Sequence, residues 1–580
     1  MITQPLTLQH ERVDDIPLLL AIMQGLNLPE LMERHLGSHH LHRGISNGWL
    51  ATVWMAFILS EANHCKVSVQ DWARSLPHTL ATIIGQPLRD VEFSDDRLAI
   101  ILRRLHDADW AALEADLWQE TCQVYDIPME CIRLDSSTSF GYHEIKADGI
   151  MQLGHSKDHR PDLPQLKLMA AAAQPTSQII ACDIVPGNSA DDPLYLPLIH
   201  RLRSQLKRKG LLYVGDCKMA ALETRADIAA NDDYYLMPLP KTGENTTLFD
   251  SWINKGLAGT EFQLQEFIKL DDQDEPFVYA RGYEFDRECT CELNQKPTCW
   301  KERVQVIRSE SHHTQQVKSL DERLRRATDE LLALTPSVGR GHKQIRVEVE
   351  LQTAIREILE RQRVIGLLEV TWRRDEHVNE RQKGRGRPGP ERATETITTV
   401  RYEVTGVRPV AEAIHQAKER LGWRVQVINL PKKRCDLETA ILLYNGGWSV
   451  ERDFHLLKDR PLGIQPFWVR EEEQIIGMTR LLTIALRVLP LFELQVRAGL
   501  QEAQEELSGL YEGQPKRKTA TPTAVRLLKA ICRLRITLTQ VESSWGESWQ
   551  IKPLPTLLRR ILELVKLSPA VYEQLAENSS

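Results

Sequence analysis

The chain has 580 residues, 42% of them hydrophobic and 26% charged, which is the composition of an ordinary soluble globular protein. This length allows three or four domains, each with a core of its own. The net charge of −7 weakly disfavours a nucleic-acid partner but does not exclude one, because such binding depends on local basic patches.

Targeting and membrane segments are not expected. The opening residues MITQPLTLQHERVDD are polar and acidic and lack the basic head and apolar core of an export signal. We therefore expect a cytoplasmic protein whose ten cysteines are reduced. The apolar stretch Trp49–Leu59 is too short to span a bilayer, and the stretch Ile475–Leu494 contains Arg480, Arg487 and Glu493. Both stretches are expected to be buried helices.

Residues 1–130 are expected to form a helical N-terminal domain. Apolar residues recur at three- and four-residue intervals in DDIPLLLAIMQGLNLPELMERHL, with breaks at Gly25 and Pro29. The same spacing continues in ISNGWLATVWMAFILSEANH and in DDRLAIILRRLHDADWAALEADLWQETCQ. The sequence contains no internal repeat here.

The pattern changes to strands at residue 131. Four successive strands are predicted at CIRLDSSTSF, GIMQLGHS, PQLKLMAAAAQ and SQIIACDIVPG. A helix follows and is stopped by Gly210, and LLYVGD then has the continuous apolar run of a strand buried on both faces. MAALETRADIAAN is predicted as a helix and DYYLMPLP as a further strand. Residues 131–240 therefore predict a mixed α/β sheet.

Residues 241–435 are irregular and are interpreted as an inserted domain. Strand candidates are EFQLQEFIKL, PFVYARGYEF, ERVQVIRS and TTVRYEVTGV, and a long charged helical stretch runs through about residues 315–365. Residues 373–392 hold seven basic and four acidic side chains, a local charge of +3 (7 − 4), and their Gly and Pro content predicts a mobile loop. Contact with DNA and a role as a solvated linker are equally open for this loop.

The remainder of the chain is predicted to be helical. A strong helix begins after Asp436 and runs through ETAILLYNGGWSVERDFHLLKDR, and further helices follow to about residue 500. A basic break at 515–518 precedes a helical C-terminal tail over residues 501–580.

Acidic side chains at strand positions are the first sign of chemistry. Asp135 is embedded in the first strand after Ile132 and Leu134, and Asp216 ends the buried strand LLYVGD. A carboxylate beside an apolar strand is costly unless it binds a metal or enters a hydrogen-bond network. Two such aspartates in one sheet suggest a site for a hard divalent cation, which prefers oxygen ligands.

A third acidic side chain lies on the helix predicted after Asp436. Tyr444, Glu451 and Lys458 are spaced by seven residues, so a continuous helix would place all three on one face. A partly exposed helix face without a catalytic role would show the same spacing.

These pieces together resemble DDE transposases of the RNase H-like fold. The resemblance is to the bacterial insertion-sequence branch (IS-four type, long-chain sub-branch) with the helix motif Tyr-x2-Arg-x3-Glu-x6-Lys. Residues 444–458, YNGGWSVERDFHLLK, match its Tyr, Glu and Lys, whereas Gly447 stands at the arginine position and Arg452 or Lys458 is a candidate substitute. Supporting matches are RLDSS at 133–137, YVGD at 213–216 and GHSKDHRPDLPQ at 154–165.

The resemblance implies a catalytic site of Asp135, Asp216 and Glu451 that holds Mg²⁺, with Mn²⁺ as a substitute. Two metal ions held by carboxylates activate a water or a 3′-hydroxyl and stabilise the leaving oxygen in phosphodiester cleavage. The separation of 235 positions between Asp216 and Glu451 (451 − 216) requires an inserted domain within the RNase H-like core. Such insertions go with cutting through a DNA hairpin. The implied partners are inverted-repeat DNA ends, target DNA and a second copy of the chain, on the bacterial nucleoid.

Several side chains are candidates for DNA contact in this scheme. Stacking of a displaced base on an aromatic ring contributes about 1–3 kcal/mol, and related transposases use a tryptophan of the insertion for it. Trp300, between the basic residues of TCWKER, is the first candidate, with packing in the protein core as the alternative and Trp252 and Trp372 as rivals. The phosphate-binding candidates are Tyr444, Lys458, Arg452, Lys157 and Arg160.

Zinc and ATP are not expected. Cys289, Cys291 and Cys299 have a spacing that fits no standard zinc finger, even with His312 and His313 nearby. The glycine-rich stretch GRGRPG is not followed by a helix with a phosphate-binding lysine.

Three functions stay open at this point. The first is a transposase that cleaves and joins the ends of its own element. The second is an RNase H-like nuclease or resolvase that cleaves without joining. The third is a non-catalytic DNA-binding descendant, which Gly447 leaves possible.

Overall fold

The chain folds into two compact units in a computed structural model that describes residues 9–39, 43–259, 261–271, 273–293, 295–339, 342–382, 394–459, 461–467, 469–543 and 546–576. The first unit comprises Met1–Met237, Glu288–Glu302 and Ile428–Ser580. The second comprises Pro238–Arg287 and Arg303–Val427. The insertion expected at 241–435 thus corresponds largely to the second unit, but residues 288–302 belong to the first.

The N-terminal part of the first unit is helical, as its apolar spacing predicts. Its helices are α1 (Ile16–Gly25), α2 (Leu28–Leu36), α3 (Asn47–Glu61), α4 (Lys66–Arg74), α5 (Pro77–Ile84), α6 (Asp95–Asp107) and α7 (Trp110–Val124). The side chains of Ser46 and Asp109 accept hydrogen bonds from backbone amides at the starts of α3 and α7, which stabilises those helix ends. Helix α3 is buried over most of its length.

The long helix α16 (Glu472–Ala503) passes through the core of the first unit. A Cβ at Gly477 would lie 2.0 Å from the carbonyl oxygen of Leu102, so this glycine allows the close approach of α6. The charges on α16 are neutralised inside the protein: Arg487 pairs with Glu114 of α7, and Glu493 pairs with Arg452 at 3.0 Å. Among the described residues, α16 alone has the length and apolarity to cross a membrane, and 89% of its apolar window is buried.

The C-terminal tail is only partly helical, which corrects the expectation for residues 501–580. Its elements are α17 (Ala524–Arg533), β13 (Thr537–Ser543), β14 (Gly546–Ile551), α18 (Thr556–Leu564), α19 (Ala570–Glu573) and the 3-10 turn η3 (Gln574–Ala576). Strand β13 pairs with β14 and also with β1 (His10–Arg12), near the opposite end of the chain. The N-terminal helices, α16 and the tail share one hydrophobic core.

The α/β part of the first unit has strand order β4-β3-β2-β5-β6. Strands β2, β3 and β4 are antiparallel neighbours, whereas β2, β5 and β6 are parallel. This is the order of the RNase H-like fold, as expected. The elements are β2 (Met129–Phe140), β3 (Gln165–Pro175), β4 (Gln178–Pro186), η1 (Asp192–Leu194), α8 (Tyr195–Leu206), β5 (Leu212–Val214), η2 (Cys217–Ala220), α9 (Leu222–Ala230) and β6 (Tyr234–Pro238).

One predicted strand of this region is wrong. The segment GIMQLGHS contributes only an isolated bridge between Gln152 and Gln165, while its neighbours form full strands. Its glycines pack too tightly for a regular strand partner: a Cβ at Gly154 would lie 2.3 Å from the carbonyl oxygen of Gly187.

The second unit mixes helices and strands. Its sheet order is β12-β9-β8-β7, and the predicted strands at EFQLQEFIKL, PFVYARGYEF, ERVQVIRS and TTVRYEVTGV are confirmed within β7, β8, β9 and β11. The elements are α10 (Glu244–Ala258), β7 (Gln265–Leu270), β8 (Pro276–Leu293), β9 (Lys296–Ser309), α11 (Glu310–Ala333), α12 (Glu348–Arg361), β10 (Leu368–Gln382), β11 (Thr394–Pro409), α13 (Ala411–Glu419) and β12 (Trp423–Ile428). Strands β8, β9 and β12 have residues in both units.

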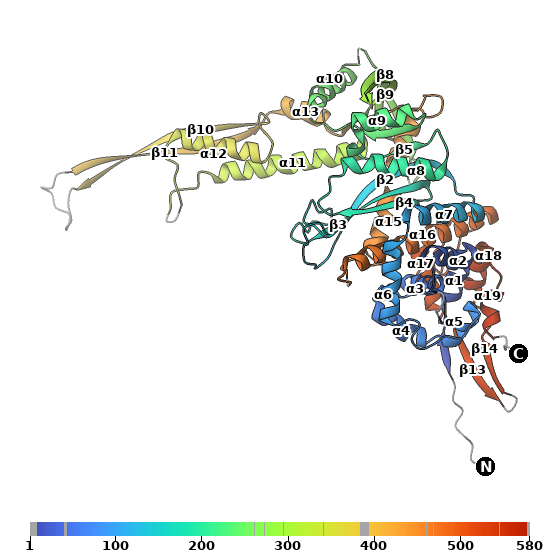
Figure 1. Ribbon diagram of the computed structural model, residues 1–580. Coiled ribbons are helices and arrows are strands. Elements are labelled where there is room, and N and C mark those ends of the chain that lie inside the picture. The colour runs from blue at the N-terminus through green and yellow to red at the C-terminus, as the bar shows by residue number, and fades with distance from the viewer. Residues whose placement is uncertain are drawn as a thin grey trace. The chain divides into compact units, whose positions relative to one another are not determined.

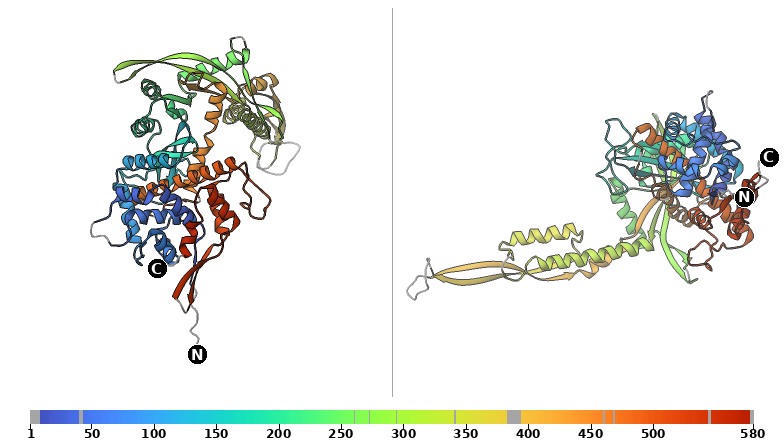
Figure 2. Two further views of the ribbon diagram at one scale, coloured as in Figure 1. Left: turned by 90° about the vertical axis from the view of Figure 1, so that its right-hand side faces the viewer. Right: turned by 90° about the horizontal axis from the view of Figure 1, so that it is seen from below.

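A long arm of the second unit consists of α11, α12 and the β10–β11 hairpin. The hairpin extends well beyond α11 and α12 (Figures 1 and 2). The arm has a small core of its own around Leu320, Leu351 and Val404. The loop expected at 373–392 is in part a strand, because residues 373–382 pair with 394–403 in the hairpin. Residues 383–392 of that loop lie outside the described part of the chain. The single charged helical stretch expected near 315–365 is two helices.

The buried Asp15 makes folding depend on pH. Its side chain is fully buried at the start of α1, and its Oδ1 accepts a hydrogen bond of 2.6 Å from Ser60. Burial raises the pKa of Asp15 to about 6 from 3.8. The folded state therefore favours the protonated acid, and this contribution to stability is lost as the pH rises from 3.8 through about 6.

We predict that Asp15→Asn raises the free energy of unfolding at pH 7.5 by roughly 1–3 kcal/mol, since a shift of one pKa unit corresponds to about 1.4 kcal/mol. The gain should shrink at about pH 5, where the wild-type acid is already protonated. Urea unfolding at both pH values measures this difference. The exposed Asp71→Asn is the matched control, and an equal effect of both variants at both pH values would contradict the prediction.

Candidate active site

Asp135 lies within β2, beside the parallel strand β5. Its Oδ1 accepts a 2.7 Å hydrogen bond from the amide of Ser136, and the ammonium of Lys157 is 3.6 Å away. Burial raises the pKa of Asp135, Lys157 opposes the shift, and the negative charge of Asp216 adds to it. Two aspartates that influence each other in this way are neighbours.

Asp216 follows β5 at the level of Asp135. Strands β2 and β5 pair Ile132 with Tyr213 and Arg133 with Val214, an offset of 81 residues (213 − 132). The separation of Asp135 and Asp216 is also 81 (216 − 135), so the two carboxylates occupy equivalent positions on adjacent strands. The register of a parallel pair thus explains why residues so far apart in sequence meet.

The carboxylate of Asp216 is held by its own turn and by a buried tyrosine. Its Oδ1 accepts hydrogen bonds from the amide of Lys218 at 2.9 Å and from the hydroxyl of Tyr195 at 2.6 Å. Tyr195 is fully buried on α8, and burial together with the charges of Asp216 and Asp135 raises its pKa. The tyrosine therefore stays protonated and acts as a hydrogen-bond donor.

Glu451 is on α15 (Trp448–Lys458), which packs against β2 and α16. The expected continuous helix is wrong here: α14 (Leu437–Asn445) ends and α15 begins across Gly446 and Gly447. Tyr444 consequently belongs to a different helix from Glu451 and Lys458. The side chain of Glu451 is exposed.

A buried arginine links Glu451 to the strand that carries Asp135. Arg133 lies two residues before Asp135 on β2. Burial lowers the pKa of Arg133, and the negative charges of Asp135 and Glu451 oppose this shift. Arg133 was not among the residues predicted from the sequence. Its position two residues from Asp135, on the same face of a strand, was the available signal.

Asp135 and Asp216 are neighbours in the structure, whereas no contact among the described residues joins Glu451 to either of them. Within the described ranges, no three His, Cys, Asp or Glu side chains lie close enough together to hold a metal ion. The candidate donor set consists of carboxylate oxygens, a type of ligand that suits Mg²⁺ or Mn²⁺.

The segment 154–165 connects the strand and the helix of the site. The ammonium of Lys157 donates to the carbonyl oxygen of Ser136 at 2.5 Å and to its hydroxyl at 2.9 Å. The next residue, Asp158, pairs with Lys458 at 2.6 Å. Sequence reasoning placed Lys157 and Lys458 at the site but missed Asp158, although it stands inside the segment that carries the resemblance.

The remaining predicted phosphate contacts already have partners within the protein. Arg452 pairs with Glu493 of α16, and Arg160 pairs with Asp162 through two hydrogen bonds of 2.9 and 2.7 Å. Tyr444 lies under the guanidinium of Arg133, 5.9 Å from the ring centroid. Arg160 and Tyr444 keep part of their surfaces open, whereas Arg452 fastens α15 to α16.

Trp300 is on β9, in the portion of that strand that belongs to the first unit. Its indole nitrogen donates a 2.7 Å hydrogen bond to the hydroxyl of Tyr235. Tyr235 in turn donates to Glu302, which Arg225 binds at 2.8 and 2.9 Å. The indole is only partly buried.

The two rival tryptophans are in the second unit. Trp252 is 8% exposed on α10, and Trp372 packs against the core of the arm and donates a hydrogen bond of 3.2 Å to Glu348. Both have the packed positions of structural side chains.

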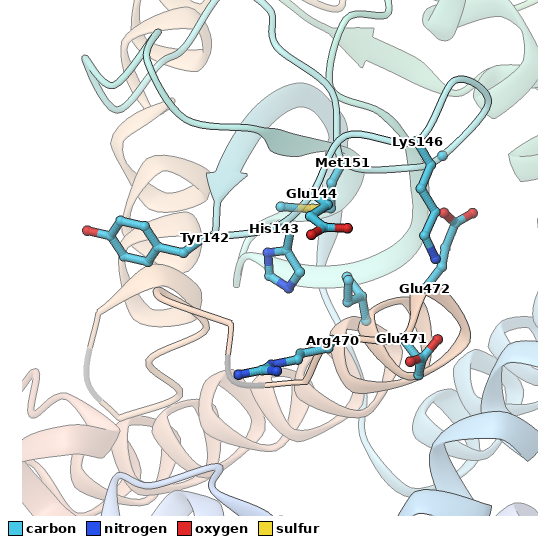
Figure 3. A pocket seen from close by; sticks show the side chains of 10 residues that line it. Tyr142, His143, Glu144, Lys146, Met151, Arg470, Glu471 and Glu472 are labelled. Carbon is cyan, nitrogen blue, oxygen red and sulfur yellow. The ribbon is translucent and has the colours of Figure 1, made fainter.

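A hollow of about 410 Å³ opens between the segment after β2 and the start of α16 (Figure 3). Nε2 of His143 donates a hydrogen bond of 2.9 Å to the carbonyl oxygen of Val469, which fastens this segment to the region before α16. The side chains around it have mixed charge: Glu144, Lys146, Arg470, Glu471 and Glu472. None of the three candidate carboxylates lines this hollow, so it is a separate surface feature.

Comparison with known proteins identifies the family of the chain. The family model of the transposase DDE domain matches residues 131–487, more than half of the chain and a span that contains all three candidate carboxylates. A cryo-EM structure of a piggyBac transposase synaptic complex with hairpin DNA aligns with 97% of this chain and 86% of its own, at 7% identity and a TM-score of 0.33. No curated protein is similar enough in sequence to count as a relative. The chain belongs to the transposase DDE-domain family.

Proposed function

We propose that this chain cleaves and rejoins DNA at the inverted-repeat ends of a bacterial insertion sequence of the Tyr-Arg-Glu-Lys branch, with Asp135, Asp216 and Glu451 as catalytic residues. The observation that supports the proposal is the offset of 81 residues between the parallel strands β2 and β5, which equals the separation of Asp135 and Asp216, together with the packing of α15 against β2. The family supports DNA as the substrate.

The same three carboxylates are the proposed ligands of Mg²⁺ or Mn²⁺. When bound, such ions activate the attacking oxygen and stabilise the leaving oxygen of a phosphodiester. Tyr195 keeps one oxygen of Asp216 in place, and Lys157 balances the charge of Asp135 before DNA and metal arrive. A side-chain nucleophile is not needed in this scheme, and neither is ATP.

The DNA contacts are assigned to groups around these carboxylates. Lys157, Lys458 and Tyr444 are proposed to approach phosphates next to the cut, with Arg160 at the margin. The N-terminal helices of residues 1–130 are proposed to read the element's ends, with two copies of the chain bringing two ends together. The enzyme would act in the cytoplasm on nucleoid DNA and proceed through a hairpin.

Removal of the third carboxylate tests the proposed chemistry. Glu451→Gln keeps the size of an exposed side chain and removes its charge, so Mg²⁺-dependent nicking of DNA that carries the element's ends should fall at least about a hundredfold. End binding, followed by gel shift, and thermal stability should stay within the range of the wild type. The exposed Glu473→Gln on α16 is the control variant.

A strand-transfer assay with the same DNA separates the candidate reactions. Joining of cleaved ends to target DNA supports a transposase. Cleavage without joining would identify a nuclease or resolvase, and end binding without cleavage in the wild type would identify a non-catalytic DNA-binding descendant.

Trp300 is proposed to stack on a base displaced during hairpin formation. We predict that Trp300→Ala spares the first nick and lowers hairpin formation by about ten- to a hundredfold, because stacking contributes about 1–3 kcal/mol per base. Denaturing gels resolve nicked strands from hairpins.

Trp300→Phe is the matched control for this prediction. Phenylalanine retains a stacking surface but removes the hydrogen bond to Tyr235, so hairpin formation should persist. Equal defects in both variants would assign the effect to the Tyr235–Glu302–Arg225 network and remove Trp300 from the DNA path.

A further inference from the structure

Helix α15 has little to hold it in place by itself. It is 11 residues long, and no side chain caps its first amide groups. The two glycines before it give the chain freedom at that point. Glu451 lies in its first turn, so any movement of the helix moves this carboxylate relative to Asp135. Contacts from elsewhere must therefore set its position.

The first of these contacts comes from Arg133. Its Nη2 donates hydrogen bonds to the carbonyl oxygens of Leu443 at 2.6 Å and Tyr444 at 3.1 Å, at the end of α14. A cation at a helix C-terminus is favourable because the last carbonyl groups lack helical partners. Arg133 is 7% exposed, and it lies on the same strand as Asp135. Strand β2, which carries Asp135, thus holds the junction between α14 and α15, the helix that carries Glu451.

Gly447 leaves the space that this guanidinium occupies. A Cβ on residue 447 would lie 2.9 Å from Nη1 of Arg133, closer than real Cβ contacts allow. At Gly446 the nearest atom would be 3.4 Å away, which is ordinary contact. Both glycines have helical backbone angles that alanine adopts without strain. A side chain on residue 447 would therefore have to displace the guanidinium of Arg133 from its observed position.

The second contact holds the end of α15. Oδ1 of Asp158 accepts a hydrogen bond of 2.6 Å from Lys458, the last residue of the helix. Oδ2 accepts from Gln465 at 2.9 Å and from Thr138 of β2 at 3.4 Å. The neighbouring amide of Lys157 donates to the Thr138 hydroxyl at 3.0 Å. Strand β2 is thus connected to the end of α15 through this segment, and through Arg133 it is connected to the end of α14, just before α15 begins.

We infer that Arg133 and Asp158 are positioning residues that fix α15 at its two ends and so set Glu451 against Asp135. Both contacts start from β2, on either side of Asp135. Strand β2, segment 156–158 and helix α15 are therefore held in a fixed arrangement. This arrangement sets the distance between the carboxylates of Asp135 and Glu451. This inference rests on the proposed function of the three carboxylates.

The matched pair Gly447→Ala and Gly446→Ala tests the contact at the start of the helix. We expect Gly447→Ala to displace the guanidinium and lower the affinity of the full-length chain for Mn²⁺ by about 10- to 100-fold, the usual cost of removing a group that orients a metal ligand. Gly446→Ala should bind Mn²⁺ like the wild type. Isothermal titration calorimetry measures the affinity, and thermal unfolding checks that both variants fold.

A double-mutant cycle of Gly447→Ala and Glu451→Gln decides whether Gly447→Ala lowers the Mn²⁺ affinity through Glu451. If it does, Gly447→Ala causes no further loss of Mn²⁺ affinity in the Glu451→Gln background. Additive losses, or equal behaviour of the two glycine variants, would overturn the inference. Mn²⁺ binding that is unaffected by Glu451→Gln would overturn the proposed function, and the inference with it.

Asp158→Ala tests the end of the helix with the same measurement. We expect a loss of Mn²⁺ affinity of about tenfold or more, matched by Lys458→Ala and not increased in the double variant. Asp158→Asn retains acceptor oxygen for Lys458 and should restore most of the affinity. Asp162→Ala is the control. Asp162 lies on the same segment and forms its ion pair with Arg160. Additive effects of Asp158→Ala and Lys458→Ala would overturn this part of the inference.

Discussion

The parallel pairing of β2 with β5 is the constraint on which the candidate site depends. Its offset of 81 residues sets Asp135 beside Asp216, and no local feature of either strand achieves this alone. Two carboxylates at this distance repel each other, and burial adds to the cost, as the raised pKa of Asp135 indicates. The neighbouring groups reduce that cost: a hydroxyl donates to Asp216, and an ammonium lies near Asp135. The site is therefore an electrostatically strained region that a divalent cation would relieve.

Several basic side chains near this site already form ion pairs with carboxylates of the protein. Lys458 is bound to Asp158, and Arg452 is bound to Glu493. A phosphate that approaches these cations competes with carboxylates that already hold them in fixed geometry. Such preorganised pairs restrict the side-chain conformations before a ligand arrives, which lowers the entropic cost of the contact. The net charge of −7 is compatible with a DNA substrate for the same reason, because a few fixed cations in one place matter more than the sum.

The sequence was most informative where local pattern and chemistry coincide. The strands of Asp135 and Asp216 were predictable from their apolar residues and the helix of Glu451 from its helical spacing, and the family match covers all three. The break at Gly446 and Gly447 was missed because heptad spacing persists across it. The contacts of Arg133 and Asp158 were missed because they join residues about 300 positions apart. The pairing of β13 with residues 10–12 was missed for the same reason, because it lies far outside any local window.

The pairing of β1 with β13 also affects when the N-terminal helices can finish folding during synthesis. His10 faces Thr539, and the hydroxyl of Tyr572 donates to the carbonyl oxygen of Asp14. The first helices thus remain without part of their core until the ribosome has made the segments beyond residue 524, which takes roughly half a minute to two minutes at ordinary rates of translation. During that interval their apolar faces are open to chaperones or to other nascent chains.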